Sequence, residues 1–401
     1  MEFPASRQGA LERLEGFLSG APRYAARRNH VLPGHPHVSR LSAAIRHRLI
    51  TEAEVVEATL RRYPFRAVEK FLQEVLWRSY WKGWLEMRPQ VWQHYTASVQ
   101  RKPDDGQARA VAEGLSRSGI MNHFARELLE TGYMHNHARM WWASYWIHHC
   151  GLPWELGADH FFRHLLDADP ASNTLSWRWV AGLQTRGKTY LATGQNIGKF
   201  CAPEILAAAG GVGFEEGVVA RTAGGEERED ESASPLEELP AECEFRNGEK
   251  IAVVLHDEDL YLENSPLAEV RPALVLQFFP ETDSPLPAPR AEWLAEARAD
   301  ASRRATEHFG CPVQGCSSRE DLLRESVQKG VTSLLMLQPC VGPLRDELSR
   351  LSEELAGCGM KLVRLRRKWD SVLLPHASRG FFPFWNKAGR LLAKSGTETL
   401  T

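Results

Sequence analysis

The spacing of hydrophobic residues changes about halfway along this chain. Up to about residue 200, apolar side chains recur at intervals of three and four, as in ALERLEGFL and ITEAEVVEATLRRY, and β-branched alternation is absent. Thr51, followed three residues later by Glu54, forms a capping-box pattern at the start of the second of these segments. The first half therefore predicts an all-α domain, residues 1–201.

Short apolar runs alternate with helical patterns in the last 150 residues or so. The runs are IAVVLHDEDLYL, ALVLQFFPE, CPVQGC, VTSLLMLQP and MKLVRLRRKW, and segments such as AEWLAEARADASRRATEHF and LRDELSRLSEELAGCG separate them. This alternation predicts an α/β domain, residues 249–401, with a doubly wound parallel sheet and helices on both faces. Residues 202–248 are Gly-rich and then acidic. They have too few large apolar groups to offset their ordering entropy, so we expect a linker there.

Composition narrows the function only slightly. The 401 residues are 43% hydrophobic and 25% charged, and the net charge of -2 argues against bulk attachment to nucleic acid, although a local basic groove stays open. No run of eighteen apolar residues and no secretory signal pattern occurs, so we expect a cytoplasmic protein without a membrane partner. The seven cysteines are an odd number without a CxxC pair, which suits free thiols.

Metal and phosphate sites have weak support in the second half. Cys311 and Cys316 are read either as metal ligands or as structural thiols, and HDED at 256–259 either as a metal cluster or as a polar strand end and turn. The structural interpretation is preferred for both, and no metal is expected. No GxGxxG or GxxxxGKS loop opens a predicted helix, so the chemistry is sought in the helical half.

Aromatic and polar residues share helix faces in that half. Glu74, Trp77, Trp81 and Trp84 lie at offsets that place a carboxylate and three indoles along one stripe. Each indole, taken alone, is also consistent with a packed core.

A second group lies further along the chain. Asp169 is a good N-cap and Pro170 a good first helical residue, so a helix begins there, with Asn173 and Trp177 one turn apart. A carboxamide one turn from an indole is well placed to meet a flat polar ring. The pair Arg139 and Asp167 is also consistent with a structural salt bridge.

Five motifs then point to one family. SRLSAAIRHRLIT, FLQEVLWRSYW, TGYMHNHARM, LLDADPASNTLSWRW and NIGKF occur in this order. Over about residues 20 to 200 the chain resembles the FAD-binding domain of the photolyase and cryptochrome superfamily, whose pattern runs SRLSPYL, E-x-x-WRE, TGxMHNRxRM and DGDxAxNxxxWQW. The resemblance implies FAD as the cofactor.

It also implies roles for individual positions. Those matched to the FAD phosphates and ribityl chain are Tyr24, Ser39, Arg40, Leu41 and Ser42. Those matched to the surroundings of the isoalloxazine ring are Arg139, Asp167, Asp169 and Asn173, with Asn173 facing flavin N5.

Further matches concern electron transfer and substrate. Trp177 and Trp154 match the first two members of an electron-carrying tryptophan chain, and Trp92, Trp142 or Trp146 is a candidate for the third. The positions matched to the pocket for a pyrimidine dimer flipped out of DNA are Glu74, Trp77, Asn136, Met140 and Trp179.

The resemblance implies light-dependent repair of cyclobutane pyrimidine dimers in single- or double-stranded DNA by a monomer. Light excites reduced FAD, an electron passes to the dimer, the ring splits and the electron returns. Departures weaken this reading: His137 replaces an Arg that would contact DNA phosphate, and Val38 replaces a Thr. A cryptochrome-like photoreceptor without repair activity is the alternative.

Domain order is a further departure. Photolyases carry an α/β antenna domain before the FAD domain, whereas here VVLHDEDLYLENSPL and FFPFWNKAGRLL resemble the beginning and end of that antenna domain and follow the helical half. We therefore expect a permuted arrangement. The sequence does not indicate whether a second, antenna chromophore binds.

Overall fold

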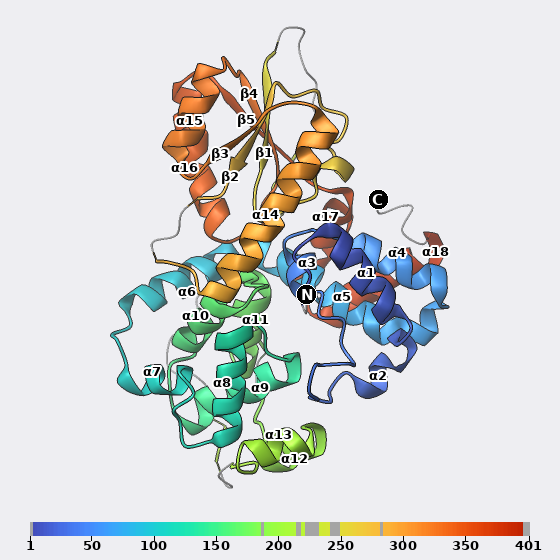
Figure 1. Ribbon diagram of the computed structural model, residues 1–401, viewed down its shortest axis with the longest axis vertical. Coiled ribbons are helices and arrows are strands. Elements are labelled where there is room, and N and C mark those ends of the chain that lie inside the picture. Colours follow the sequence, from blue (N-terminus) through green and yellow to red (C-terminus); the bar gives the residue numbers. More distant parts are fainter. Residues whose placement is uncertain are drawn as a thin grey trace.

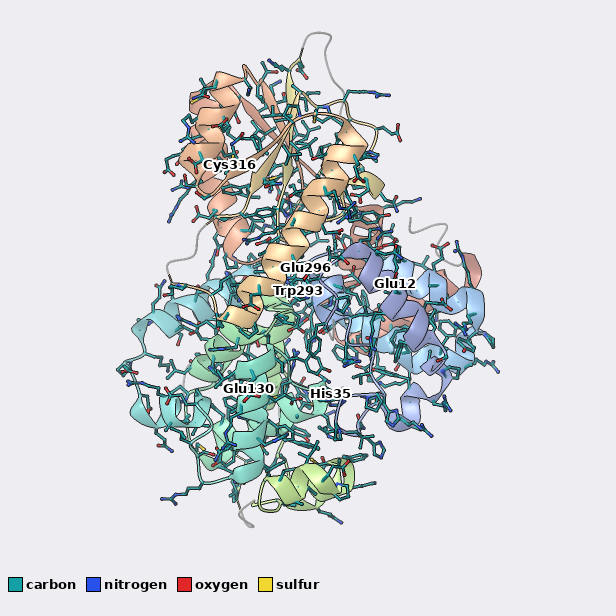
Figure 2. All side chains as sticks on the ribbon, in the orientation of Figure 1. Glu12, His35, Glu130, Trp293, Glu296 and Cys316 are labelled. Atoms are coloured by element: carbon teal, nitrogen blue, oxygen red, sulfur yellow. The ribbon has the colours of Figure 1, made fainter. Side chains whose placement is uncertain are left out.

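In the computed structural model, the chain forms a helical part followed by a part built on a five-stranded sheet (Figure 1). The structure describes residues 3–185, 188–213, 218–220, 232–240, 249–280 and 284–395. Helix α14 (Ala288–Phe309) runs from the sheet to the helical part, and Figure 2 shows its Trp293 and Glu296 where the two parts meet. None of the helices in the described ranges combines the length and apolar character that a membrane span requires.

The first part is helical, as predicted. Its elements are α1 (Arg7–Leu18), η1 (Ala21–Arg23), α2 (Tyr24–Arg27), α3 (Ser42–Arg46), α4 (Glu52–Arg62), α5 (Phe65–Glu86), α6 (Pro89–Arg101), α7 (Gly106–Ala112), α8 (Gly119–Thr131), α9 (Asn136–Ser144), η2 (Tyr145–His149), α10 (Trp154–His164), α11 (Pro170–Val180), α12 (Gly194–Phe200) and α13 (Pro203–Ala208). The capping box is confirmed, because the Thr51 hydroxyl accepts from the Glu54 amide and the Glu54 carboxylate accepts from the Thr51 amide. Helical structure continues beyond the expected boundary at residue 201, to Ala208.

The second part contains the predicted parallel sheet. Its strands are β1 (Ile251–Leu255), β2 (Leu274–Phe278), β3 (Val313–Cys316), β4 (Ser333–Leu337) and β5 (Lys361–Leu365). They pair in the order β3-β2-β1-β4-β5, and every pair is parallel. After η3 (Leu262–Asn264) and α14, the connecting helices are α15 (Arg319–Gln328) and α16 (Pro343–Gly357).

The two faces of the sheet bury different cores. Ile251, Val253 and Leu255 of β1 belong to the core that continues through α14 into the helical part. Ala252 and Val254 point to the other face and join a smaller core built with α15 and α16. Since successive strand residues face opposite sides, a continuous apolar strand such as β1 is what a sheet covered on both faces requires.

A set of ion pairs joins the two parts at the end of β1. Arg46 donates to Glu258 at 2.7 Å, and Arg48 donates to Asp259 at 3.0 Å. His47 contacts the Asp257 carbonyl oxygen at 2.6 Å, and burial lowers the pKa of its imidazole to about 4, so the ring is neutral at pH 7. The HDED segment is therefore a polar turn that docks on α3 and the residues after it. Within the described ranges no cluster of His, Cys, Asp and Glu has the arrangement of a metal site.

The end of the chain returns to the helical part. Segments α17 (Lys368–Leu373), η4 (Leu374–Ser378) and α18 (Phe381–Ser395) pack along α5. Trp369 donates its indole N–H to the Ser79 hydroxyl at 3.0 Å, and Tyr80 donates to the Arg379 carbonyl at 2.8 Å. A Cβ at Gly83 would lie 2.8 Å from the Leu374 carbonyl oxygen, so a glycine is needed there for close approach.

Part of the expected linker is described. In residues 232–240, the Ser234 amide donates to the Met87 carbonyl at 2.8 Å, and Glu237 forms ion pairs with Arg364 and Arg345. This acidic stretch is therefore bound along the surface at the junction of the two parts. Residues 214–217, 221–231 and 241–248, which belong to the same expected linker, lie outside the described residues.

Candidate functional site

The SRLS motif borders a basic pocket. Arg40 has a φ of +57°, a left-handed conformation that costs a non-glycine residue on the order of 1–3 kcal/mol and is often found at functional sites. Arg13 donates from Nε to the Ser39 carbonyl at 2.8 Å and so holds the loop. The pocket beside it has a volume of about 450 Å³, and its charged or aromatic lining residues include Arg13, Arg23, Arg27, Arg40, His37 and Tyr24.

This pocket suits an anionic group. None of its twelve lining residues is acidic, and four are arginines, whose guanidinium groups match phosphate geometry. Tyr24 and Arg40 line it as the resemblance implies, whereas the Leu41 side chain is fully buried, so Leu41 can contact a ligand only through its backbone. The Ser42 carbonyl accepts a hydrogen bond from Arg78 at 3.4 Å.

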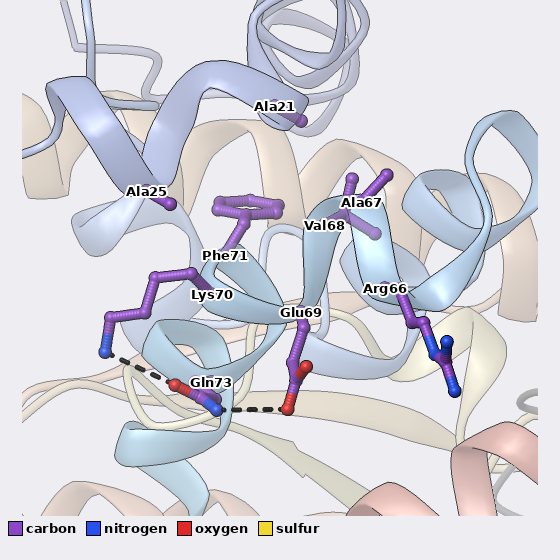
Figure 3. A pocket seen from close by; sticks show the side chains of 9 residues that line it. All are labelled: Ala21, Ala25, Arg66, Ala67, Val68, Glu69, Lys70, Phe71 and Gln73. Carbon is purple, nitrogen blue, oxygen red and sulfur yellow. Dashed lines mark hydrogen bonds between the residues drawn. The ribbon is translucent and has the colours of Figure 1, made fainter.

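A second, shallower pocket of about 300 Å³ lies at the start of α5 (Figure 3). Lys70 donates to Gln73 at 3.3 Å, and Gln73 donates to Glu69 at 3.4 Å across its floor. Three of its polar lining residues, Glu69, Lys70 and Gln73, therefore bond one another. It contains none of the residues predicted for the cofactor or the substrate.

The predicted Arg139–Asp167 pair is present. Arg139 on α9 donates from Nη1 to Asp167 at 3.1 Å and from Nε to the Met134 carbonyl at 2.9 Å. Asp167 is buried, and the Arg139 and Arg78 charges outweigh desolvation, so its pKa lies below the usual range and the carboxylate is ionised at pH 7.

Asp169 acts as the predicted N-cap of α11. Its carboxylate accepts from the Ser172 amide at 2.9 Å and forms an ion pair with Arg78 of α5. Ala168, at the position of a glycine in the family pattern, has a φ of +25°. The tight turn brings Asp167 and Asp169 to the same end of α11, but the Asp169 carboxylate is occupied by protein partners.

Asn173 is oriented by α10. Its side-chain nitrogen donates to the Ala158 carbonyl at 2.8 Å, and the residue is buried. Because nitrogen and oxygen diverge from the same amide carbon, this bond leaves the carbonyl oxygen as the group available to a ligand. Such an oxygen can accept a hydrogen bond from a ring N–H.

The tryptophans form two branches. Trp177 lies 6.2 Å from Trp142 and 6.4 Å from Trp146 by ring centroids, and both of those partners are fully buried. Trp154 stacks on Tyr95 at 5.6 Å, and Tyr95 contacts Trp92 at 5.5 Å. All three candidates for the third member of the chain are therefore linked to one of the first two, through different neighbours.

The residues predicted for the substrate have varied surroundings. Glu74 on α5 pairs with Lys70 at 2.9 Å and Arg28 at 3.6 Å. Trp77 stacks on Phe381 of α18, with centroids 3.8 Å apart and planes 7° from parallel.

The other members of this predicted pocket come from α9 and α11. Asn136 is exposed and Met140 is half-buried on α9, and Trp179 on α11 stacks on Tyr190 at 5.4 Å. The structure records no hydrogen bond, ion pair or ring contact among the five predicted residues, all of which are described, and one face of Trp77 is already covered.

His137 is turned into the protein. It contacts the Asn29 carbonyl through Nδ1 at 2.8 Å and lies 4.4 Å from Trp141 and 5.2 Å from Phe200 by ring centroids. Desolvation lowers the pKa of its imidazole, so the ring is neutral at pH 7. It therefore does not replace the phosphate-binding charge of an arginine.

Sequence reasoning missed several residues of this region. Arg78 lies in the recognised WRS triplet, but only the fold shows its bond to Asp169. Tyr95 follows Trp92 by three residues, a helical spacing that would have placed the two rings on one face. Arg23 and Arg27 are four positions apart, and this helical spacing would likewise have placed the two side chains on one face.

Comparison with known proteins agrees with this geometry. Residues 71–200 match the family described as the FAD binding domain of DNA photolyase. The deoxyribodipyrimidine photo-lyase of Agrobacterium fabrum is 32% identical over 182 residues, which cover 43% of this chain and 38% of the relative. The photo-lyase of Escherichia coli is 28% identical over 198 residues, covering 47% and 42%, and a cryptochrome DASH of Ostreococcus tauri is 29% identical over 195 residues, covering 46% and 35%.

Two solved structures are also similar. A cryptochrome from Synechocystis gives a TM-score of 0.44 at 21% identity, covering 49% of this chain and 43% of the other. A class III photolyase from Agrobacterium tumefaciens gives 0.42 at 28% identity, covering 49% and 42%. The chain spans less than half the length of the curated relatives it matches. Residues 71–200 therefore match the FAD-binding domain of DNA photolyase, and the helical part of the chain is similar to photolyases and to a cryptochrome DASH.

Proposed function

We propose that this protein uses light and bound FAD to split cyclobutane pyrimidine dimers in DNA. The observation that carries the proposal is the Arg139–Asp167 ion pair together with the oriented Asn173 amide, all within the matched FAD-binding region. Several relatives matched by the same region are named deoxyribodipyrimidine photo-lyase. The Arg-rich pocket beside Tyr24 and Arg40 supports binding of a cofactor that carries phosphates.

The protein's residues have separable tasks in this proposal. The basic pocket and the SRLS loop hold the phosphates, and Arg139, kept in place by Asp167, presents a fixed charge next to the ring system. The Asn173 carbonyl oxygen accepts from a ring N–H and so favours a reduced cofactor. Bound FAD supplies light absorption and the transferable electron. Trp177 and Trp154 provide a route by which electrons reach the cofactor site.

A photoreceptor without repair activity is the second candidate, and two observations favour it. His137 is neutral and turned inward, so it contributes no charge to a DNA phosphate. Phe381 covers a face of Trp77 that a flipped pyrimidine could otherwise stack on. In this alternative, the ion pairs between the helical and α/β parts would transmit the light signal.

The repair assay separates the two candidates. Purified protein is reduced, mixed with dimer-containing single- or double-stranded DNA and exposed to blue light, with a dark sample as control. Light-dependent loss of dimers supports repair. A flavin-loaded protein that does not bind dimer-containing DNA in the dark would support the photoreceptor. A purified protein without any blue-absorbing chromophore would contradict both candidates.

Phe381→Leu tests the cover on Trp77, with Phe382→Leu as a matched control because Phe382 is 69% exposed. Aromatic stacking contributes about 0.5–1.5 kcal/mol beyond area burial, so removing the competing ring should tighten dimer-DNA binding about two- to tenfold. Filter-binding or anisotropy titrations with dimer DNA measure the change. Equal affinities for both variants would mean that Trp77 is not a substrate contact.

Three wider attributes complete the proposal. We place the protein in the cytoplasm as a monomer, and we interpret the order of helical part before α/β part as a permutation of the photolyase arrangement. The α/β part would then be the counterpart of an antenna domain, with or without a second chromophore. Size-exclusion chromatography with light scattering tests the monomer, and extraction of the bound pigments tests the chromophore.

A further inference from the structure

An aromatic path leads from Trp177 to the α/β part. Trp177 packs against the backbone of α10 at Gly157, where an added Cβ would lie 2.7 Å from the Trp177 Cζ3 atom. Gly157 is three residues after Trp154, so the two positions share a face of the helix. Trp154 then stacks on Tyr95, and Tyr95 contacts Trp92.

The path ends at a carboxylate that the family resemblance does not include. Trp92 is only 3% exposed, and its indole Nε1–H donates to Asp346 Oδ2 at 2.9 Å. Asp346 is on α16, in the α/β part, and it is exposed to solvent. Partial burial of the carboxyl raises its pKa above the usual value, while the carboxylate stays the dominant form at pH 7.

The other branch ends differently. Trp146 donates its indole N–H to the Pro153 carbonyl at 2.8 Å, and a peptide carbonyl is a far weaker base than a carboxylate. Trp142 and Trp146 are both fully buried, and within the described residues neither donates its indole N–H to a carboxylate. Of the three candidates for the terminal tryptophan, Trp92 alone donates to an ionisable, solvent-exposed acceptor.

We propose that Asp346 is the proton acceptor of oxidised Trp92 and that Trp92 is the terminal member of the electron path. The inference rests on the proposed light-driven use of FAD. When the bound FAD is in its oxidised form, light would make it the one-electron oxidant of this path, through Trp177 and then Trp154. One electron moves from Trp92 to oxidised Trp154, past Tyr95, and restores the neutral Trp154 indole. The Trp92 Nε1–H bond then breaks and its proton passes to Asp346 Oδ2, giving a neutral Trp92 radical and a carboxylic acid.

This transfer stabilises charge separation. An oxidised indole is a much stronger acid than a neutral one, and the acceptor is already in hydrogen-bond contact. Once the proton has left, return of the electron to Trp92 also requires return of a proton. Because the Asp346 carboxyl is exposed, it can pass the proton on to water and regain its charge.

Asp346→Asn in the FAD-loaded full chain is the test. The amide oxygen still accepts the hydrogen bond but does not take the proton at neutral pH. Glu353→Gln is the matched control, because Glu353 is exposed on the same helix and its replacement by Gln removes the same charge. Transient absorption after a blue flash distinguishes the protonated from the deprotonated tryptophan radical, in H2O and in D2O.

We expect deprotonation to slow by about 10²-fold in Asp346→Asn, the lower end of what a positioned base contributes, and to be unchanged in Glu353→Gln. Trp92→Phe should remove the deprotonated radical altogether. Wild-type-like radical kinetics in Asp346→Asn would overturn the role of Asp346, even where flavin photoreduction is normal. A wild-type protein that binds flavin but forms no tryptophan radical would instead overturn the electron path itself.

A measurement on the protein in the dark complements the transient-absorption experiment. In NMR spectra of labelled protein kept in the dark, the Trp92 indole N–H resonance should shift in Asp346→Asn and stay unchanged in Glu353→Gln. An unshifted resonance would show that the 2.9 Å bond is not formed in solution and would overturn the proposal independently of photochemistry.

Discussion

Replacement of Asp259 by Asn should strongly weaken the association of the helical part with the α/β part. Asp259 is 1% exposed and accepts from Arg48 at 3.0 Å and from Arg367 at 2.7 and 2.8 Å. Its backbone partner is the Tyr261 amide, at 3.2 Å. Asn has one acceptor oxygen and no charge. Arg48 would keep its bond to the Asp370 carboxylate at 2.5 Å, whereas Arg367 would keep only the carbonyl oxygens of Asn264 and Tyr261 among its recorded partners in the described ranges.

Two routes give the size of the effect. The arginines lower the pKa of Asp259 from 3.8 to about 2, which corresponds to roughly 2.5 kcal/mol of stabilisation at pH 7. Removal of one partner of a buried ion pair costs about 3–5 kcal/mol, because the remaining charge stays uncompensated. The free energy of unfolding should therefore fall by about 2.5–5 kcal/mol.

Urea unfolding at pH 7, followed by tryptophan fluorescence and by far-ultraviolet circular dichroism, measures this loss. Asp159→Asn is the control, because Asp159 forms only a partly exposed pair with Arg163 at 3.4 Å, and its loss should cost less than about 0.5 kcal/mol. Non-coincident fluorescence and dichroism transitions in Asp259→Asn would indicate that the two parts separate before either unfolds. A loss below about 1 kcal/mol would refute the reasoning.

Two other perturbations have a defined sign. Gly157→Ala should destabilise the protein by about 1–3 kcal/mol, because the new Cβ collides with Trp177. The control Gly357→Ala places its Cβ in open space and should be neutral or slightly stabilising. Equal melting temperatures for the two variants would contradict the packing of Trp177 on Gly157. Acidification should destabilise the site: Arg78 and Arg46 lower the pKa of buried Asp169 from 3.8 to about 2, so its contribution is complete above pH 4 and is lost as the pH falls towards 2. A pH series of unfolding free energies checks this. Asp169→Asn should lose less stability than the wild type over that window, although Asp259, whose pKa is also lowered to about 2, still titrates there.

The local pattern of the sequence was sufficient for the elements. The Thr51 capping box, the Asp169–Pro170 helix start and the strands of the sheet were all confirmed, because each depends on residues within a few positions of one another. The alternation of short apolar runs with helical patterns correctly predicted a parallel sheet covered on both faces. Motif order was likewise sufficient to identify the FAD-binding region.

Only the tertiary structure decided what those elements do to one another. The HDED segment was correctly expected to be a turn, but two of its arginine partners, Arg46 and Arg48, lie about 210 positions earlier. Phe381 lies about 300 positions after the indole it covers, and Asp346 lies 254 positions after Trp92. Hydrophobic periodicity fixes which face of a helix is buried but not which remote element covers it. The acceptor at Trp92 and the cover on Trp77 depend on how α16 and α18 dock, and the inward position of His137 depends on Asn29 and Phe200, so all three emerged only from the fold.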